Sequence, residues 1–96
     1  MRPSEVFEQN RQLIRDLVSQ SRTANPRIFG SVLHGTDKEG SDIDILVDTL
    51  PETTLFDLGR LQVELEETLG VPVQVVTPRE LSRYFRDKVL AEAQPV

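Results

Sequence analysis

The sequence contains no cysteine and no tryptophan, and aromatic residues make up only 5% of it. The lack of cysteine excludes disulfide bridges and thiolate metal sites. No apolar run approaches the roughly 20 residues that a membrane-spanning helix needs. The residues that follow Met1 are also too polar to form the apolar core of a signal peptide. We therefore expect a cytoplasmic protein that does not insert into membranes.

Basic residues are in the minority. There are 11 Lys and Arg against 16 Asp and Glu, which gives a net charge of −5. Binding to the phosphate backbone of nucleic acids requires clustered positive charge, so direct nucleic-acid binding is not expected. A chain of 96 residues has room for one domain with a thin core. We expect a single domain over residues 1–96, without a separate substrate-binding domain.

Helix and strand signals alternate in the first half of the chain. Apolar periodicity predicts a helix from a cap at Ser4 to about residue 21. Asn25-Pro26 should break this helix, and residues 27–29 should form a short strand. Residues 31–34 fit one helical turn that Gly35 ends.

The second half continues the alternation with a strand over residues 42–48. Thr54 is expected to cap the next helix, and Gly70 suits the position just past its end. Its buried stripe is built from regularly spaced leucines, namely Leu58, Leu61, Leu65 and Leu69. A strand over residues 71–76 and a helix from a capping box at Thr77 to about residue 93 should follow. The order predicts an α/β sandwich with a small mixed β-sheet packed against helices.

Two aspartates one residue apart begin the strand at residues 42–48. Alternation places Ile43, Ile45 and Val47 toward the core, whereas Asp42 and Asp44 share the other face. Their Cα atoms should lie about 6.5–7 Å apart. Two carboxylates in this arrangement can share one or two Mg²⁺ ions, as the sites of phosphoryl transfer do.

A Gly-Ser turn precedes the aspartate pair. Gly30 and Ser31 should supply backbone N–H groups and a hydroxyl to a phosphate, and glycine permits a close approach of the backbone. Ten residues, Val32 to Ser41, separate Ser31 from Asp42.

Gly30-Ser31, this spacer and Asp42-x-Asp44 in an apolar strand resemble the signature of nucleotidyltransferases of the DNA polymerase β type. The short domain with its strand from Val73 and its helical tail resembles the minimal nucleotidyltransferases (MNT), the antitoxins of HEPN/MNT toxin–antitoxin pairs. The resemblance implies that Asp42 and Asp44 are catalytic and bind Mg²⁺ or Mn²⁺, and that Gly30 and Ser31 hold the phosphates of ATP. It also implies a HEPN ribonuclease toxin as the partner, with a tyrosine hydroxyl that receives AMP.

Other side chains near the motif are weaker candidates. Ser41 is expected to orient the turn before Asp42 and to belong to the nucleotide-binding residues. His34 is the only histidine and stays open as a contact to phosphate or acceptor. Asp48 is expected to be a solvated strand end. The Tyr84-Phe85 pair is expected to pack in the core, with a partner interface as the alternative.

Gln74 departs from the family pattern. Members that the chain resembles usually carry a third carboxylate in this strand, which completes the metal site and helps to deprotonate the attacking hydroxyl. Glutamine carries no charge and cannot act as a base. Three hypotheses stay open: an adenylyltransferase, a catalytically impaired module that neutralises its partner by stoichiometric binding, and a transferase for a small-molecule acceptor.

Overall fold

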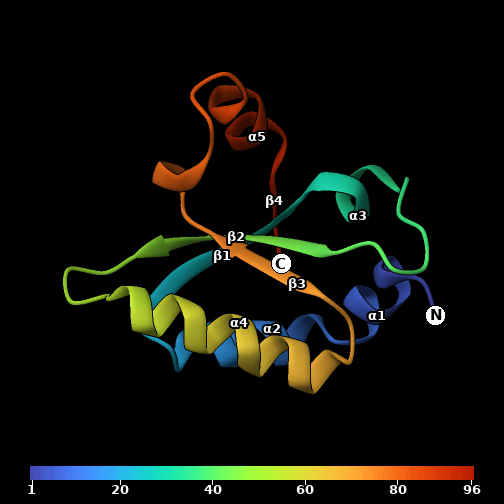
Figure 1. The fold of residues 1–96 in the computed structure, drawn as a ribbon, viewed down its shortest axis with the longest axis horizontal. Coiled ribbons are helices and arrows are strands. Elements are labelled where there is room, and N and C mark those ends of the chain that lie inside the picture. Colours follow the sequence, from blue (N-terminus) through green and yellow to red (C-terminus); the bar gives the residue numbers. More distant parts are fainter.

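The computed structural model describes all residues, 1–96, and contains one mixed four-stranded sheet. The strands lie in the order β3-β2-β1-β4 (Figure 1). Their bounds are β1 Thr23–Phe29, β2 Ile43–Thr49, β3 Val73–Val76 and β4 Gln94–Pro95. β2 pairs antiparallel with β1 and parallel with β3. The predicted α/β class with a small mixed sheet is confirmed.

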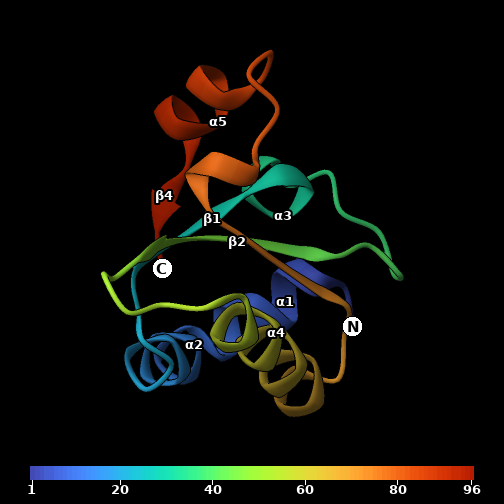
Figure 2. The same cartoon turned by 60° about the vertical axis from the view of Figure 1, so that its left-hand side comes forward.

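The helices lie on both faces of the sheet (Figure 2). One face is covered by the helices α1 Pro3–Gln9, α2 Arg11–Ser19 and α4 Leu55–Leu69. The other carries α3 Gly30–His34, the 3₁₀ turn η1 Pro78–Glu80 and α5 Arg86–Glu92. No helix is both long enough and apolar enough to cross a bilayer.

The hydrophobic core lies between the sheet and the face formed by α1, α2 and α4. Ile43, Ile45 and Val47 of β2 are fully buried in it, as their alternation predicts. Leu46 points to the opposite face and is fully buried as well, because the C-terminal segment covers that part of β2. The central strand is thus held from both faces, and the site described below begins at its first residue.

The first predicted helix is wrong in two respects. It is divided into α1 and α2 at Asn10, whose side-chain amide donates to the carbonyl of Val6 at 2.8 Å. An Asn side chain that competes for backbone groups in this way favours a helix end. The helix also begins at Pro3, with Pro in the first turn, so Ser4 is not its cap.

β1 is longer than the predicted strand at residues 27–29. It starts at Thr23 and runs through Asn25-Pro26, which we expected to be a break. The register with β2 shifts between Ala24 and Arg27, and Asn25 has a φ of 54°. A bulge tolerates a proline that cannot donate to the ladder, so the strand continues past it.

The C-terminal part differs most from expectation. Thr54 caps α4 and Gly70 follows it in the left-handed conformation, as predicted. The predicted last helix, however, is reduced to η1, an irregular stretch and α5, and the short β4 was missed. The Arg86 guanidinium donates to the carbonyl oxygens of Pro78 and Leu81 at 2.8 Å each, which folds this segment back on itself.

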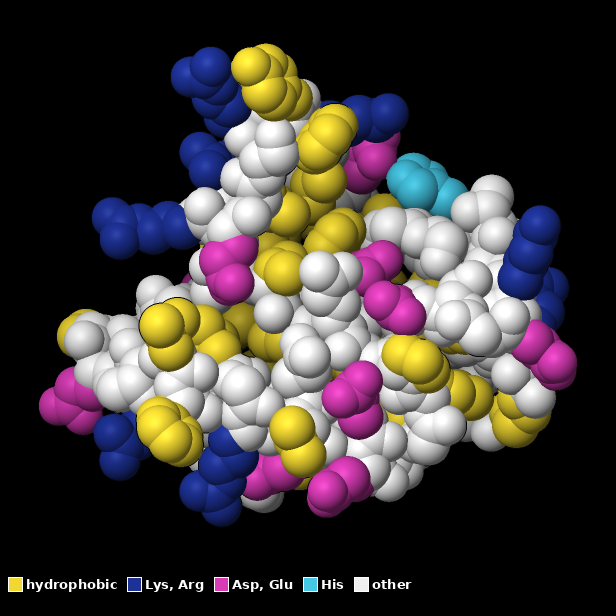
Figure 3. Space-filling model, in the orientation of Figure 1, with side chains coloured by type: hydrophobic (Ala, Val, Ile, Leu, Met, Phe, Trp, Pro, Cys, Tyr) yellow, Lys and Arg dark blue, Asp and Glu magenta, His cyan; other side chains and the backbone are white.

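The aromatic pair on this segment lies at the surface. Tyr84 is 80% exposed and Phe85 is 61% exposed, so the expectation that they pack in the core is wrong. Figure 3 shows hydrophobic side chains beside Lys and Arg over the projecting C-terminal segment.

Candidate functional site

The two aspartates stand at the start of β2. Asp42 is exposed in the residue before the strand, and Asp44 is half-buried in its second position. Burial, and after it the charge of Asp42, raises the pKa of Asp44 to about 6. The two carboxylates therefore repel each other in a partly dry setting, and a bound cation would relieve this repulsion.

The Gly-Ser turn lies directly against Asp44. Phe29, the last residue of β1, pairs with Asp44, and Gly30 follows it with a φ of 73°. A Cβ on Gly30 would stand 2.1 Å from Asp44 Oδ2, so a side chain here would force that carboxylate or the turn to move. The positive φ and this contact both favour glycine, and the structure brings Gly30, Ser31 and the aspartate pair together.

Gln74 lies on the other side of the pair. It is the residue of β3 that pairs with Asp44 in the parallel ladder, and its side chain is exposed. No group of three or more His, Cys, Asp or Glu that could hold a metal exists in the structure. No other residue therefore supplies the third carboxylate that the family usually carries at the position of Gln74.

The donor set suits one Mg²⁺ better than two. Magnesium is commonly held by one or two carboxylates, with the remaining positions filled by water and by phosphate oxygens of the substrate. Asp42 and Asp44 provide such a pair, and the Asp44 carboxylate lies against the backbone of Gly30. The amide oxygen of Gln74 can add only a weak ligand.

Asp48 is engaged elsewhere. Its carboxylate accepts from Arg27 at 2.6 Å and from Asn25 at 3.0 Å. The Asn25 hydrogen bond, followed by the hydrogen bond and charge of Arg27, lowers the pKa of Asp48 despite its partial burial. Asp48 is thus a paired residue at the end of β2, and neither a free solvated end nor a third ligand.

Ser41 and His34 also have partners. Ser41 Oγ accepts from the backbone N–H of Lys38 at 3.0 Å and closes the turn that leads into Asp42, which agrees with the expected orienting role. His34 Nε2 lies 3.1 Å from Glu92 Oε2 and links α3 to α5 at the surface. The structure shows no contact of either side chain with the aspartate pair.

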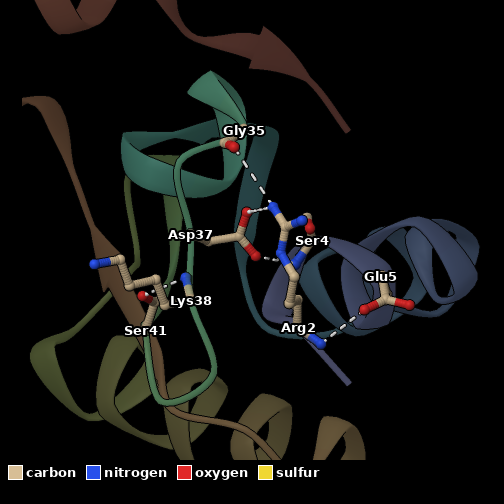
Figure 4. Close-up of polar contacts among 7 residues, drawn as sticks. All are labelled: Arg2, Ser4, Glu5, Gly35, Asp37, Lys38 and Ser41. Atoms are coloured by element: carbon tan, nitrogen blue, oxygen red, sulfur yellow. Dashed lines mark hydrogen bonds and ion pairs between the residues drawn. The ribbon is translucent and has the colours of Figure 1, made fainter.

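One buried residue of this region was missed in the sequence. Asp37, in the loop between α3 and β2, is only 4% exposed and is bound by Arg2 and Ser4 (Figure 4). In the sequence it is one charge among several in a polar loop. Its partners lie 33 and 35 residues away, so no local pattern could have indicated it.

Comparison with known proteins agrees with this geometry. The family model described as the nucleotidyltransferase domain matches residues 10–96. A relative from Methanocaldococcus jannaschii whose name is that of a protein adenylyltransferase is 46% identical over 69 residues, which cover 72% of this chain and 74% of that one.

Two solved structures share the fold. One is described as a minimal nucleotidyltransferase; it is 38% identical, has a TM-score of 0.86, and the match covers 97% of this chain and 95% of that chain. The other, described as a toxin–antitoxin with AMP-PNP, is 25% identical, has a TM-score of 0.76, and the match covers 90% of this chain and 71% of that chain. The chain therefore belongs to the nucleotidyltransferase domain family, as its motifs predict, and is by class a transferase with the fold of the minimal nucleotidyltransferases.

Proposed function

We propose that this protein is an antitoxin that binds MgATP and transfers AMP to a hydroxyl of a cognate HEPN-type toxin. The observation that carries the proposal is the contact between the Asp44 carboxylate and the backbone of Gly30, because the carboxylate pair and the Gly-Ser turn then lie side by side. The name of the 46% identical relative supports adenylyl transfer to a protein. The toxin–antitoxin structure with AMP-PNP supports an ATP-like nucleotide and a toxin partner.

Each site residue has a defined part in this proposal. The backbone N–H groups of Gly30 and Ser31 and the Ser31 hydroxyl bind the terminal phosphates of ATP. Asp42 and Asp44 hold Mg²⁺, or Mn²⁺ in its place, and Ser41 keeps the turn before Asp42 closed. When bound, the metal neutralises charge on the triphosphate and lowers the barrier to attack on it.

The transfer joins the acceptor oxygen to the α-phosphorus of ATP. The bond between this phosphorus and the oxygen of pyrophosphate breaks, and pyrophosphate leaves. The hydroxyl proton passes to solvent, because Gln74 offers no base. AMP attached near a nuclease site adds negative charge and bulk, which repel RNA. The expected outcome is slow modification of the toxin, because no positioned base assists the attack.

A second candidate function, neutralisation without catalysis, rests on Gln74. Gln74 leaves the site without a third carboxylate, and no other acidic side chain replaces it. The fold could then retain nucleotide affinity and neutralise the toxin by stoichiometric contact alone.

Two variants separate these functions. AMP transfer to the co-purified toxin is measured with ATP labelled at the α-phosphate, using wild type, Asp42→Asn and Gln74→Asp. The enzyme hypothesis predicts label with wild type, none with Asp42→Asn, and a gain of at least about 10-fold with Gln74→Asp, since a positioned base contributes about 10²–10⁴-fold. Undiminished neutralisation by Asp42→Asn, with no label from any variant, would establish the binding module.

A further inference from the structure

Asp37 belongs to neither the nucleotide turn nor the aspartate pair, yet it is the acidic side chain with the least exposure in the protein. Its Oδ2 accepts from the backbone N–H of Ser4 at 2.8 Å, and its Oδ1 accepts from Arg2 Nη2 at 3.1 Å. The same Arg2 nitrogen donates to the carbonyl oxygen of Gly35 at 3.4 Å. We call these four residues, Arg2, Ser4, Gly35 and Asp37, the Asp37 clamp (Figure 4).

The clamp joins the loop to a helix that is fixed in the core. The first N–H groups of a helix lack partners within it, and a carboxylate is a favourable acceptor for them. Asp37 therefore caps the Ser4 N–H of α1 from a distant loop, beside the local hydrogen bond that Arg2 N donates to Glu5 Oε1 at 2.9 Å. Val6 and Phe7 of α1 are buried in the core, so the anchor point does not move relative to the sheet.

The anchored loop connects the two halves of the proposed site. It leaves α3, which carries the Gly-Ser turn, and runs through Asp42 into β2. Between the clamp and Asp42 the loop is held by a turn in which Ser41 N donates to Lys38 O and Lys38 N donates to Ser41 Oγ, each at 3.0 Å. The N-terminal ammonium also donates to Glu39 Oε1 at 3.4 Å, but this contact is exposed to solvent and therefore weak. Because Asp42 is exposed and precedes the strand ladder, its position depends on this loop more than that of Asp44 does.

The electrostatics of Asp37 agree with a permanent anchor. Burial by itself would raise its pKa, but the Ser4 hydrogen bonds, together with the hydrogen bond and charge of Arg2, outweigh burial and lower it. The carboxylate is therefore ionised over the physiological range and keeps both hydrogen bonds.

We propose that Asp37, held by Arg2 and Ser4, is a positioning residue that fixes Asp42 for metal binding. The inference rests on the proposed function, because it concerns the affinity of that site for its cation. Outer residues that orient metal ligands typically change metal affinity by about 10–100-fold when they are replaced. We expect Asp37→Asn to raise the Mg²⁺ concentration for half-maximal nucleotide binding by about 10-fold, since one of the two donors then faces an amide N–H.

The test is a Mg²⁺ titration of the binding of a fluorescent ATP analogue, without any turnover. Wild type is compared with Asp37→Asn, Arg2→Ala, the double variant and Asp57→Asn. Asp57 is the matched control: it caps α4 by accepting from Thr54 N at 2.9 Å, on the opposite face of the sheet from α3. Loss of the α4 cap should lower Tm and leave the Mg²⁺ midpoint unchanged.

The readouts separate positioning from stability. Partial unfolding reduces the amplitude of the binding signal. A displaced Asp42 carboxylate instead shifts the Mg²⁺ concentration at which binding of the analogue is half-maximal. The inference predicts shifted midpoints for Asp37→Asn and Arg2→Ala and a double variant that is no worse than Asp37→Asn, because both act through one contact. The Arg2 side chain is 48% exposed, so Arg2→Ala can be measured even if Asp37→Asn does not fold.

Unchanged midpoints in Asp37→Asn and Arg2→Ala, with a lower Tm as in Asp57→Asn, would overturn the inference and leave the proposed function standing. A wild-type protein that binds no nucleotide at any Mg²⁺ concentration would overturn the proposed function, and the inference with it.

Discussion

Gly30→Ala should damage this protein more than the same change at a glycine of matched conformation. Gly30 and Gly70 have φ values of 73° and 71°, so alanine is strained equally at both positions, by about 1–2 kcal/mol. At Gly70 a new Cβ meets nothing within 4 Å, but at Gly30 it would stand 2.1 Å from Asp44 Oδ2. Relief of this overlap requires movement of Asp44 or of the turn, which adds about 1–3 kcal/mol.

The expected losses in free energy of unfolding are therefore about 1–2 kcal/mol for Gly70→Ala and about 2–5 kcal/mol for Gly30→Ala. For a domain of this size each kcal/mol lowers Tm by about 4–8 °C. Urea denaturation measures both variants. Binding of the fluorescent ATP analogue should be lost in Gly30→Ala and retained in Gly70→Ala.

A second background tests the cause of the difference. In Asp44→Ala the obstructing carboxylate is gone and only the Cβ of residue 44 remains, 3.3 Å from a Cβ at position 30. Gly30→Ala should therefore cost only slightly more there than Gly70→Ala does. Equal losses for Gly30→Ala and Gly70→Ala in the wild-type background, with nucleotide binding intact in both, would refute the close contact between the turn and Asp44.

Other predictions concern stability. The pKa of Asp44 is raised to about 6, so the folded state binds this proton more tightly than the unfolded chain, and the associated stability is complete below about pH 4 and lost as pH rises through 6. In metal-free buffer, Asp44→Asn should remove this dependence of stability on pH and raise the free energy of unfolding at pH 7 by about 1–2 kcal/mol, a value discounted for solvent screening. An unchanged dependence on pH in urea denaturation between about pH 4.5 and 7 would contradict the prediction. Leu61→Ala should lower the free energy of unfolding by about 2–5 kcal/mol because Leu61 is fully buried. Phe56→Ala, at an 89% exposed position, should change it by no more than about 0.5 kcal/mol. Similar Tm values for the two variants would be inconsistent with the described core. Thr54→Ala should cost about 1 kcal/mol through loss of the hydrogen bond from Asp57 N, and a Tm equal to that of wild type would argue against this cap.

The parts of the site that the sequence predicts are those with local signals. Asp42 and Asp44 share a face because side chains alternate along a strand, and the apolar residues Ile43, Ile45 and Val47 fix which face is buried. Gly30 directly follows β1 and lies beside Asp44 because β1 and β2 pair, so a motif separated by a short spacer becomes one site. The α4 boundaries follow from Thr54 and Gly70, whose capping roles are also local.

The parts that it does not predict depend on distant partners. Pro26 lies inside β1 only because the pairing with β2 allows a bulge there. Arg86 shortens the C-terminal helix by binding carbonyl groups five and eight residues earlier. Asp37 becomes a buried anchor only once Arg2 and Ser4 reach it from α1. Hydrophobic periodicity and capping signals carry no information about such contacts.

The measurement that tests the central claim most directly is the intact mass of the proposed toxin partner, co-expressed and purified with this protein. The account predicts a mass higher by one or more AMP units, and an unmodified mass when Asp42→Asn replaces the wild type. A tight complex with an unmodified partner in the wild-type preparation would contradict transfer and would indicate an antitoxin that acts by binding.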